Sequence, residues 1–250
     1  MEKRLSRWVT LLMCAGVAAI AVRVLFMTLP PLHSYLRMRV ALLRSRPVVD
    51  DYIRRHQVRK LQLGAGNNSL HGWLNTDVEP GPGQAFLDVT KPFPVPDRTF
   101  HYVTSEHLLE HLSYEEGRAM LRECYRILRP GGKVRIATPN LLRFLELFRQ
   151  DKTEEARRYV EQKLRWHGWP EVQTPECMIL NLEFSSFGHK FLYDPGTLRA
   201  TLATAGFQRA REFEPGESDD PVLRGVEFRH TGPWREANTF ETMVVEAVRP

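Results

Sequence analysis

Cysteine is scarce in this chain of 250 residues, which has three: Cys14, Cys124 and Cys177. An odd count without C-x-x-C spacing argues against a disulfide framework and against a cysteine-rich zinc site. Phosphate-binding signatures are missing as well. No G-x-x-x-x-G-K-[ST] occurs, and Ser69 stands where a dinucleotide fingerprint would place its third glycine. These absences argue against a P-loop enzyme and against a dinucleotide-dependent oxidoreductase.

Concentrated charge of one sign is also absent. The formal net charge is +5, but the basic residues are spread along the chain and include the flanks of an N-terminal hydrophobic segment. Charge distributed in this way favours attraction to a membrane surface over nucleic-acid binding. The length and a hydrophobic content of 42% fit one ordinary domain with an appendage.

The sequence KLQLGAGNN, residues 60–68, is an apolar strand that runs into a glycine turn. Gly64 and Gly66 accept positive φ and let backbone N–H groups approach a ligand closely. Two later strands end in Asp77 and Asp88, and a carboxylate at a strand tip suits the hydroxyl groups of a ribose. Without a phosphate-binding signature, these features predict an adenosine cofactor that lacks phosphates, commonly S-adenosylmethionine (SAM). Taken alone, the turn is equally compatible with a tight strand-to-helix connection.

Most of residues 58–248 resembles the class I SAM-dependent methyltransferases, in the type-11-like branch that includes the quinone-biosynthesis methyltransferases. The matching pieces are LQLGAG (61–66), GWLNTDVEP (72–80), FLDVTKPFPVPDRTFHYV (86–103), SEHLLEHL (105–112) and ECYRILRPGGKVRIATPN (123–140). The last piece is the most specific, because a helix ending in R-x-L-[RK]-P-G-G before a β-branched strand recurs throughout that branch. The tail, residues 181–207, looks like a bacterial subgroup often of unassigned substrate.

The resemblance implies a set of cofactor contacts. They are Leu63, Gly64, Ala65, Gly66 and Asn67 in the turn, Asp77 at the ribose, Asp88 and Val89 at the adenine, and Ser105, Glu106 and His107 at the methionine end. Gln62 and Asn68 depart from the family pattern, which has an acid and a glycine there. Glutamine can still accept or relay a hydrogen bond to the cofactor's ammonium group, and asparagine tolerates the left-handed conformation. The short interval before Asp77 predicts a first crossover helix of one or two turns.

Alternating strands and helices predict an α/β fold: a Rossmann-like, doubly wound, mostly parallel seven-stranded sheet, preceded by an N-terminal hydrophobic helix. Strands are expected at 60–64, 73–77, about 85–88, 100–104, 133–138, 207–213 and 240–248, the last as an antiparallel edge strand beside REFEP. Ligands of such sheets bind at the carboxyl ends of the strands. Insertions at 141–166 and 214–238 are expected to cap that pocket. The resemblance implies that such elements bind the methyl acceptor, whereas their composition alone indicates only surface loops.

Methyl transfer from a sulfonium requires alignment of acceptor and methyl group, and a base if the acceptor carries a proton. The candidate catalytic residues are His189 and Tyr193, which precede a helix capped by Asp194, and His111. His189 and Tyr193 can equally form a structural hydrogen-bond pair, and His111 can equally be a packing residue. We predict no metal, because Glu110 of HLLEH is next to the second histidine and no third ligand is evident.

A hydrophobic run, residues 8–29, precedes Pro30 and Pro31, which are expected to end any helix. At about 1.5 Å per residue the run is roughly 33 Å long, close to the hydrocarbon thickness of a bilayer. We therefore predict a single-pass membrane anchor, and the basic residues that follow it favour a cytoplasmic C-terminal domain. An interfacial helix and a cleaved signal peptide are the alternatives. The expected domains are the anchor (1–31), a basic linker with a short helix at 47–57 (32–57) and a methyltransferase domain (58–250).

The sequence therefore predicts a membrane-localised, SAM-dependent methyltransferase with a small-molecule, lipid or glycan acceptor and no nucleic-acid partner. The alternative is a SAM-binding scaffold or regulatory domain without catalysis, which the departures at Gln62 and Asn68 favour. The sequence does not indicate an oligomeric state.

Overall fold

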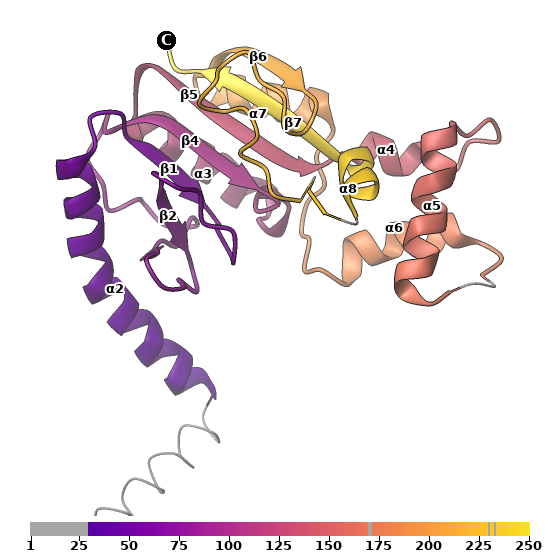
Figure 1. The fold of residues 1–250 in the computed structure, drawn as a ribbon, viewed down its shortest axis with the longest axis horizontal. Helices are drawn as coiled ribbons and strands as arrows, with labels where there is room; N and C mark the ends of the chain where they lie inside the picture. Colours follow the sequence, from indigo (N-terminus) through magenta and orange to yellow (C-terminus); the bar gives the residue numbers. More distant parts are fainter. Residues whose placement is uncertain (1–29, 170–171, 230, 233) are drawn as a thin grey trace, which may run out of the picture.

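The computed structural model describes residues 30–169, 172–229, 231–232 and 234–250, which form one sheet with helices around it (Figure 1). The strands are β1 (Lys60–Leu63), β2 (Leu74–Asp77), β3 (Ala85–Phe86), β4 (Phe100–Glu106), β5 (Leu128–Pro139), β6 (Gln208–Phe213) and β7 (Thr242–Val248). The helices are α2 (Pro30–Arg55), α3 (Tyr114–Ile127), α4 (Leu141–Glu146), α5 (Glu154–His167), α6 (Pro175–Ser185), α7 (Pro195–Thr204) and α8 (Arg235–Glu241), with a 3₁₀ turn η1 (Leu109–His111).

The sheet has seven strands in the order β3-β2-β1-β4-β5-β7-β6, and only β7 runs antiparallel to its neighbours. This confirms the predicted seven-stranded, mostly parallel α/β sheet. The pairing of the last strand with REFEP is also correct, but its place at the edge is wrong. Strand β7 lies between β5 and β6, so that β6 is the edge strand. Inside the sheet β7 satisfies its backbone hydrogen bonds on both sides, which suits its almost wholly buried side chains.

Helices α3 and α7 cover one face of the sheet, and the main hydrophobic core lies beneath them (Figure 1). Leu121 of α3 and Leu198 of α7 are fully buried together with Val134 and Ile136 of β5. Side chains alternate between the two faces of a strand, so Arg135 points to the opposite face.

A loop, residues 214–229, covers that opposite face where a crossover helix would otherwise lie. Trp73, Leu223 and Val226 form a small hydrophobic cluster there. The prediction of a first crossover helix of one or two turns is wrong, because residues 64–73 between β1 and β2 contain turns and no helix. The loop fills the resulting gap, and Arg135 beneath it is fully buried.

Helices α4, α5, α6 and α8 form a cap beyond the carboxyl end of β5, with a hydrophobic cluster of its own (Figure 1). Phe144 of α4, Tyr159 of α5 and Phe240 of α8 are buried in it. The helical insertion predicted at 141–166 is confirmed by α4 and α5. The cap is therefore placed beside the edge of the sheet where ligands of α/β folds bind.

Helix α2 differs from its prediction. It extends over 26 residues from Pro30 and contains Pro47, whereas Pro30 and Pro31 were expected to end a helix and a short helix was expected from Pro47. Proline is tolerated in a first helical turn, because the N–H groups there have no helical partner. Packing against β3 fixes the later part of the helix: Ser45 Oγ accepts a hydrogen bond from Phe86 N at 2.5 Å.

The hydrophobic run 8–29, predicted as a membrane anchor, lies outside the described residues. Within the part of the chain that the structure describes, no helix combines the length and the apolar character needed to cross a membrane.

Candidate functional site

The glycine turn after β1 adopts the conformation expected of a ligand-binding turn. Gly64 has φ +65° and Gly66 has φ +49°, a region that side chains of L-residues rarely occupy. A Cβ atom at Gly64 would lie 3.0 Å from the Leu108 side chain, whereas a Cβ at Gly66 would meet no atom within 4 Å. Gly64 is thus needed for close packing against the end of β4, and Gly66 faces open space where a ligand fits.

Asp77 at the tip of β2 is fixed by the turn itself. One carboxylate oxygen accepts a hydrogen bond from Gly66 N at 2.8 Å, and the other accepts one from Glu79 N at 2.8 Å. A carboxylate offers about four acceptor positions, so each oxygen retains capacity for a ribose hydroxyl. The predicted geometry of a glycine turn beside a strand-end acid is therefore present.

The two departures from the family pattern have structural roles in this turn. Gln62 is buried, donates to Asn68 O at 2.9 Å and accepts from Leu70 N at 3.1 Å. Both ends of the Gln62 side-chain amide are thus hydrogen-bonded to the loop after β1. The structure therefore does not support the predicted hydrogen bond from Gln62 to a cofactor ammonium group. Asn68 does not use the left-handed conformation, because the non-glycine residues with positive φ in the described chain are Arg98, His107 and Arg209.

Gln84 is a turn residue that the sequence analysis missed. Its side-chain nitrogen donates to Gly66 O at 2.7 Å and to Ser69 Oγ at 3.0 Å, while its oxygen accepts from Gly81 N at 2.8 Å. The contact joins the β2–β3 loop to the glycine turn. No local sequence signal marks Gln84, since the interaction depends on two loops meeting at the sheet edge.

Among the predicted cofactor contacts after β3 and β4, some side chains already have hydrogen-bond partners in the protein and others do not. Asp88 accepts from Thr90 N and Oγ1 through one oxygen and thereby shapes its own turn next to buried Val89. Ser105 is buried, and its hydroxyl has no hydrogen-bond partner among the described residues. Glu106 accepts from the backbone N–H groups of residues 228 and 229 and so holds the end of the 214–229 loop. Of these groups, the second carboxylate oxygen of Asp88 and the buried Ser105 hydroxyl have no hydrogen-bond partner among the described residues.

His107 is held in a strained backbone conformation with φ +47°. Such a conformation costs about 1–3 kcal/mol in a residue with a side chain, and it persists where surrounding contacts enforce it. Here Nε2 lies 2.9 Å from Thr242 Oγ1, and the backbone N–H donates to Ala137 O at 2.9 Å. The strain marks the carboxyl end of β4 as a candidate functional position.

Among the predicted catalytic residues, His111 and His189 lie together and Tyr193 does not join them. The two imidazole rings are in edge contact with centroids 4.9 Å apart. Burial lowers the pKa of His189, which favours the neutral ring at neutral pH. Tyr193 is fully buried in the main core, and a Cβ on Gly117 of α3 would lie 2.6 Å from its hydroxyl. Burial also raises the pKa of Tyr193, so the phenol is a poor candidate base.

A buried ionic group under the cap was not predicted. Lys163 of α5 lies 3.2 Å from Glu183 of α6 and 2.9 Å from Glu241 of α8, and all three side chains are buried. Tyr159 donates to Glu241 at 2.7 Å. Burial and the neighbouring Glu241 raise the pKa of Glu183. The three residues are far apart in sequence, and a lysine within a helix gives no sign of burial.

A comparison with sequence families identifies the central part of this fold. Residues 84–136, from β3 to the middle of β5, match the model of a family described as a methyltransferase domain. The chain carries a methyltransferase domain. This confirms the resemblance and the enzyme class predicted from the sequence, and with them SAM as the cofactor. A sequence comparison with curated proteins gives no match.

Solved structures similar to this methyltransferase share little sequence with it. A SAM-dependent methyltransferase from Archaeoglobus fulgidus is 15% identical, with 84% of this chain and 94% of that chain covered and a TM-score of 0.47. A SAM-dependent methyltransferase from Thermotoga maritima is 11% identical, with coverages of 88% and 97% and a TM-score of 0.44. A phosphoethanolamine N-methyltransferase from Haemonchus contortus is 13% identical, with coverages of 77% and 49% and a TM-score of 0.42. Similarities of this size carry no conclusion about substrate.

The residues at the carboxyl ends of β1, β2 and β4 fit SAM in three respects. Open space lies next to Gly66, Asp77 retains acceptor capacity, and the buried Ser105 hydroxyl has no partner in the described structure. SAM supplies a methyl group activated by a sulfonium. The methyltransferase fold supplies the turn and the carboxylate that would hold its nucleoside.

Replacing Asp77 by alanine is expected to weaken SAM binding by about 1–3 kcal/mol, the range for losing hydrogen bonds to a charged group. The loss combines the ribose contact with the anchor that Asp77 provides for Gly66 N. Isothermal titration calorimetry measures the change. Glu79→Ala is the matched control, because only the backbone N–H of Glu79 contacts Asp77. If Asp77→Ala binds normally and Glu79→Ala does not, the assignment of the ribose ligand is wrong.

Proposed function

We propose that this methyltransferase acts at the cytoplasmic face of a membrane on a lipid acceptor, or on a small molecule or glycan attached to a lipid. The observation that carries the proposal is the apolar surface of the cap. Seven large hydrophobic side chains are 41–50% exposed on the segment from α4 to just past α6: Leu142, Leu145, Phe148, Trp166, Met178, Phe184 and Phe187.

This exposure is informative because of where it occurs. The cap adjoins the carboxyl end of β5 (Figure 1). The glycine turn follows β1 and His111 follows β4, and the carboxyl ends of these parallel strands lie at the same edge of the sheet. Single exposed hydrophobic residues are ordinary, but apolar groups gathered on one structural unit are typical of contact with a lipid or with another apolar surface. An amphipathic acceptor would rest its apolar part on the cap and present its polar group to the site.

The N-terminal sequence supports the same location. Residues 8–29 form an apolar run of about bilayer length, and basic residues follow it. An anchor of this kind raises the local concentration of the enzyme at its substrate without taking part in the reaction.

Methyl transfer to such an acceptor is an SN2 displacement. A lone pair of the acceptor forms the new bond to the methyl carbon while the carbon–sulfur bond breaks, and S-adenosylhomocysteine leaves. The chain holds the two reactants in line and excludes water through the cap. For an acceptor that carries a proton, His111 and His189 are the candidate groups beside the site to receive it, because Tyr193 is enclosed in the core.

Deletion of residues 1–29 is expected to release the enzyme from membranes and to leave SAM affinity unchanged within about twofold. The deletion retains α2, whose Ser45, Val49 and Tyr52 pack against the sheet. Activity toward a membrane-embedded acceptor should fall by about 100-fold, the lower end of the gain that tethering provides. Membrane fractionation, calorimetry with SAM, and transfer of labelled methyl groups to a lipid extract measure the three effects.

Four outcomes would contradict the proposal. If carbonate washing releases the full-length protein from membranes, the protein has no membrane-spanning anchor. A C-terminal reporter that is active only outside the cytoplasm would reverse the topology. Labelling confined to the aqueous fraction of a cell extract would exclude a lipid acceptor, and SAM binding without labelling of any fraction would favour the non-catalytic scaffold.

A further inference from the structure

Glu110, His111 and His189 bring three donor atoms to one place. One ligand atom from each residue lies within 4.8 Å of the other two. Glu110 and His111 belong to the η1 turn after β4, and His189 lies 78 positions further along the chain, after α6. Backbone hydrogen bonds hold the two segments together, because Glu110 O accepts from Lys190 N at 2.7 Å and from Phe191 N at 3.2 Å. The grouping is therefore built into the fold.

Two of the donor atoms are buried and unsatisfied within the described structure. Glu110 Oε1 and His189 Nδ1 have no hydrogen-bond partner, and their side chains are 0% and 7% exposed. His107 Nδ1 lies 3.1 Å from Glu110 Oε1, an ion pair only when the His107 ring is protonated, and Glu183 Oε2 is 3.8 Å from His189 Nδ1, beyond hydrogen-bonding distance. Buried polar atoms are almost always paired, and an unpaired carboxylate oxygen is costly.

The charges around this group also do not balance. The buried carboxylates are Glu110, Glu183 and Glu241, and Lys163 is the one buried ammonium group that contacts any of them in the described structure. Lys163 contacts Glu183 and Glu241 and leaves Glu110, which has the His107 ring at 3.1 Å beside it as a cation only when that ring is protonated. A buried charge requires a partner. A divalent cation next to Glu110 would supply the missing charge.

We propose that Glu110, His111 and His189 bind one Zn²⁺ ion. Two imidazole nitrogens and one carboxylate oxygen are a donor set that suits zinc, whereas Mg²⁺ and Ca²⁺ prefer oxygen ligands throughout. The second carboxylate oxygen of Glu110 accepts a hydrogen bond from Thr138 Oγ1 at 3.0 Å, a partner of the kind that orients metal ligands. Three protein ligands leave a fourth position open for water or for a donor atom of an acceptor.

The sequence-based expectation of no metal rested on the absence of a third ligand near HLLEH. The third ligand, His189, is remote in sequence, and the fold brings it to Glu110. The assignment gives one ring-nitrogen lone pair of His111 and one of His189 to zinc, so with zinc bound neither histidine acts as the base considered above. The site does not depend on the identity of the methyl acceptor.

Purified full-length protein, stripped with a chelator and titrated with Zn²⁺ alone, is expected to bind one ion per chain. Zn²⁺ should raise its melting temperature, and excess Mg²⁺ should not compete. His111→Gln and His189→Gln should each lower the affinity for Zn²⁺ by at least about 100-fold, because loss of an outer-shell partner alone costs about 10–100-fold and these residues are direct ligands. His71→Gln, at an exposed position elsewhere, is the matched control and should bind as the wild type does.

Substitution of zinc by Co²⁺ gives a second readout, because visible absorption of the bound ion reports nitrogen and oxygen ligands. Circular dichroism of each apoprotein establishes that it is folded. Two results would overturn the proposal: folded wild-type protein that takes up less than one Zn²⁺ per chain, or equal Zn²⁺ affinity in His189→Gln and His71→Gln. Both readouts measure metal binding directly, so they remain informative if methyl transfer fails for another reason.

Discussion

Replacing Gly64 by valine is expected to reduce the affinity for SAM by at least about 100-fold, or about 2.8 kcal/mol at 1.4 kcal/mol per tenfold. Two effects act together. Gly64 has φ +65°, which a β-branched residue adopts only with strain, and a Cβ there would lie 3.0–3.2 Å from three side-chain atoms of Leu108. Leu108 lies between strained His107 and the η1 turn, so the substitution distorts both sides of the proposed cofactor site.

A matched control separates the effect of backbone strain from the effect of damage to the cofactor site. Gly131 has φ +78°, a Cβ there would meet no atom within 4 Å, and the residue lies at the opposite end of the sheet. Gly131→Val should therefore lose stability and retain SAM affinity. Thermal melting establishes how much of each variant is folded at the temperature of the titration. Unchanged affinity in a folded Gly64→Val protein would overturn the placement of the cofactor.

The carboxyl-end site was predictable because its signals are local. The apolar run into Gly64-Ala65-Gly66 and the acid at Asp77 both lie within residues 60–77, and the structure joins them through the Gly66 N–Asp77 contact. The helix before β5 was likewise predictable from its ending in R-x-L-R-P-G-G. In each case a few neighbouring residues determine the backbone conformation.

Two features that were not predicted depend on contacts between distant segments. The place of β7 between β5 and β6 depends on pairing preferences that no single strand reveals. In the same way, the approach of His189 to Glu110 depends on the path of the chain after α6. Such arrangements follow from the packing of the whole domain and leave no periodic pattern in the sequence.

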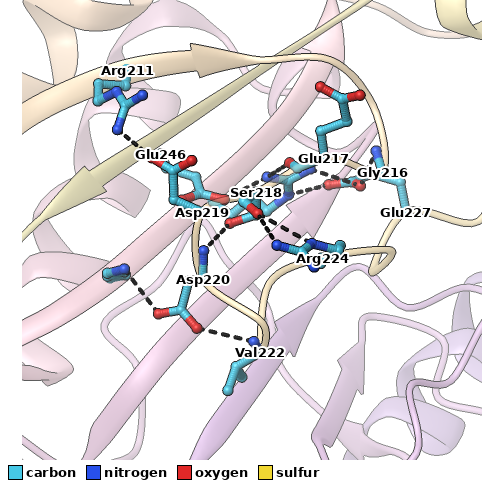
Figure 2. Close-up of polar contacts among 12 residues, drawn as sticks. Arg211, Gly216, Glu217, Ser218, Asp219, Asp220, Val222, Arg224, Glu227 and Glu246 are labelled. Carbon is cyan, nitrogen blue, oxygen red and sulfur yellow. Dashed lines mark hydrogen bonds and ion pairs between the residues drawn. The ribbon is translucent and has the colours of Figure 1, made fainter.

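Arg135 is the clearest residue that sequence reasoning missed. In KVRIATP, Val134 and Ile136 alternate with Lys133 and Arg135, so the two basic residues share the face of β5 opposite the main core, and the sequence analysis assigned Arg135 no role. The 214–229 loop covers that face, and it brings Glu227 near Glu246 of β7 (Figure 2). The Arg135 side chain between these two carboxylates is 0% exposed. Its guanidinium makes a bidentate contact with Glu227, bonds Glu246 Oε1 at 2.5 Å and donates to Glu217 O at 2.8 Å.

Arg135→Met is therefore expected to destabilise the protein by about 3–5 kcal/mol, because it leaves Glu227 and Glu246 buried without a cation. Chemical denaturation measures the loss. The effect should extend to the site, since the same loop is joined to Glu106 through its backbone at residues 228 and 229. We expect SAM affinity to fall in the fraction that remains folded, and the triple variant Arg135→Met, Glu227→Gln, Glu246→Gln to recover part of the stability by removing the unpaired charges.

Arg211→Met is the matched control for Arg135→Met. Arg211 of β6 forms an ion pair with Asp219 of the 214–229 loop (Figure 2). Both side chains are about two-thirds exposed, at 65% and 67%. Exposed pairs contribute about 0–1 kcal/mol, so the control should change stability little. If Arg135→Met and Arg211→Met lose equal amounts of stability, the 214–229 loop is held by its apolar residues Leu223 and Val226. In that case the buried arginine would neutralise Glu227 and Glu246 without fixing the loop that covers the sheet.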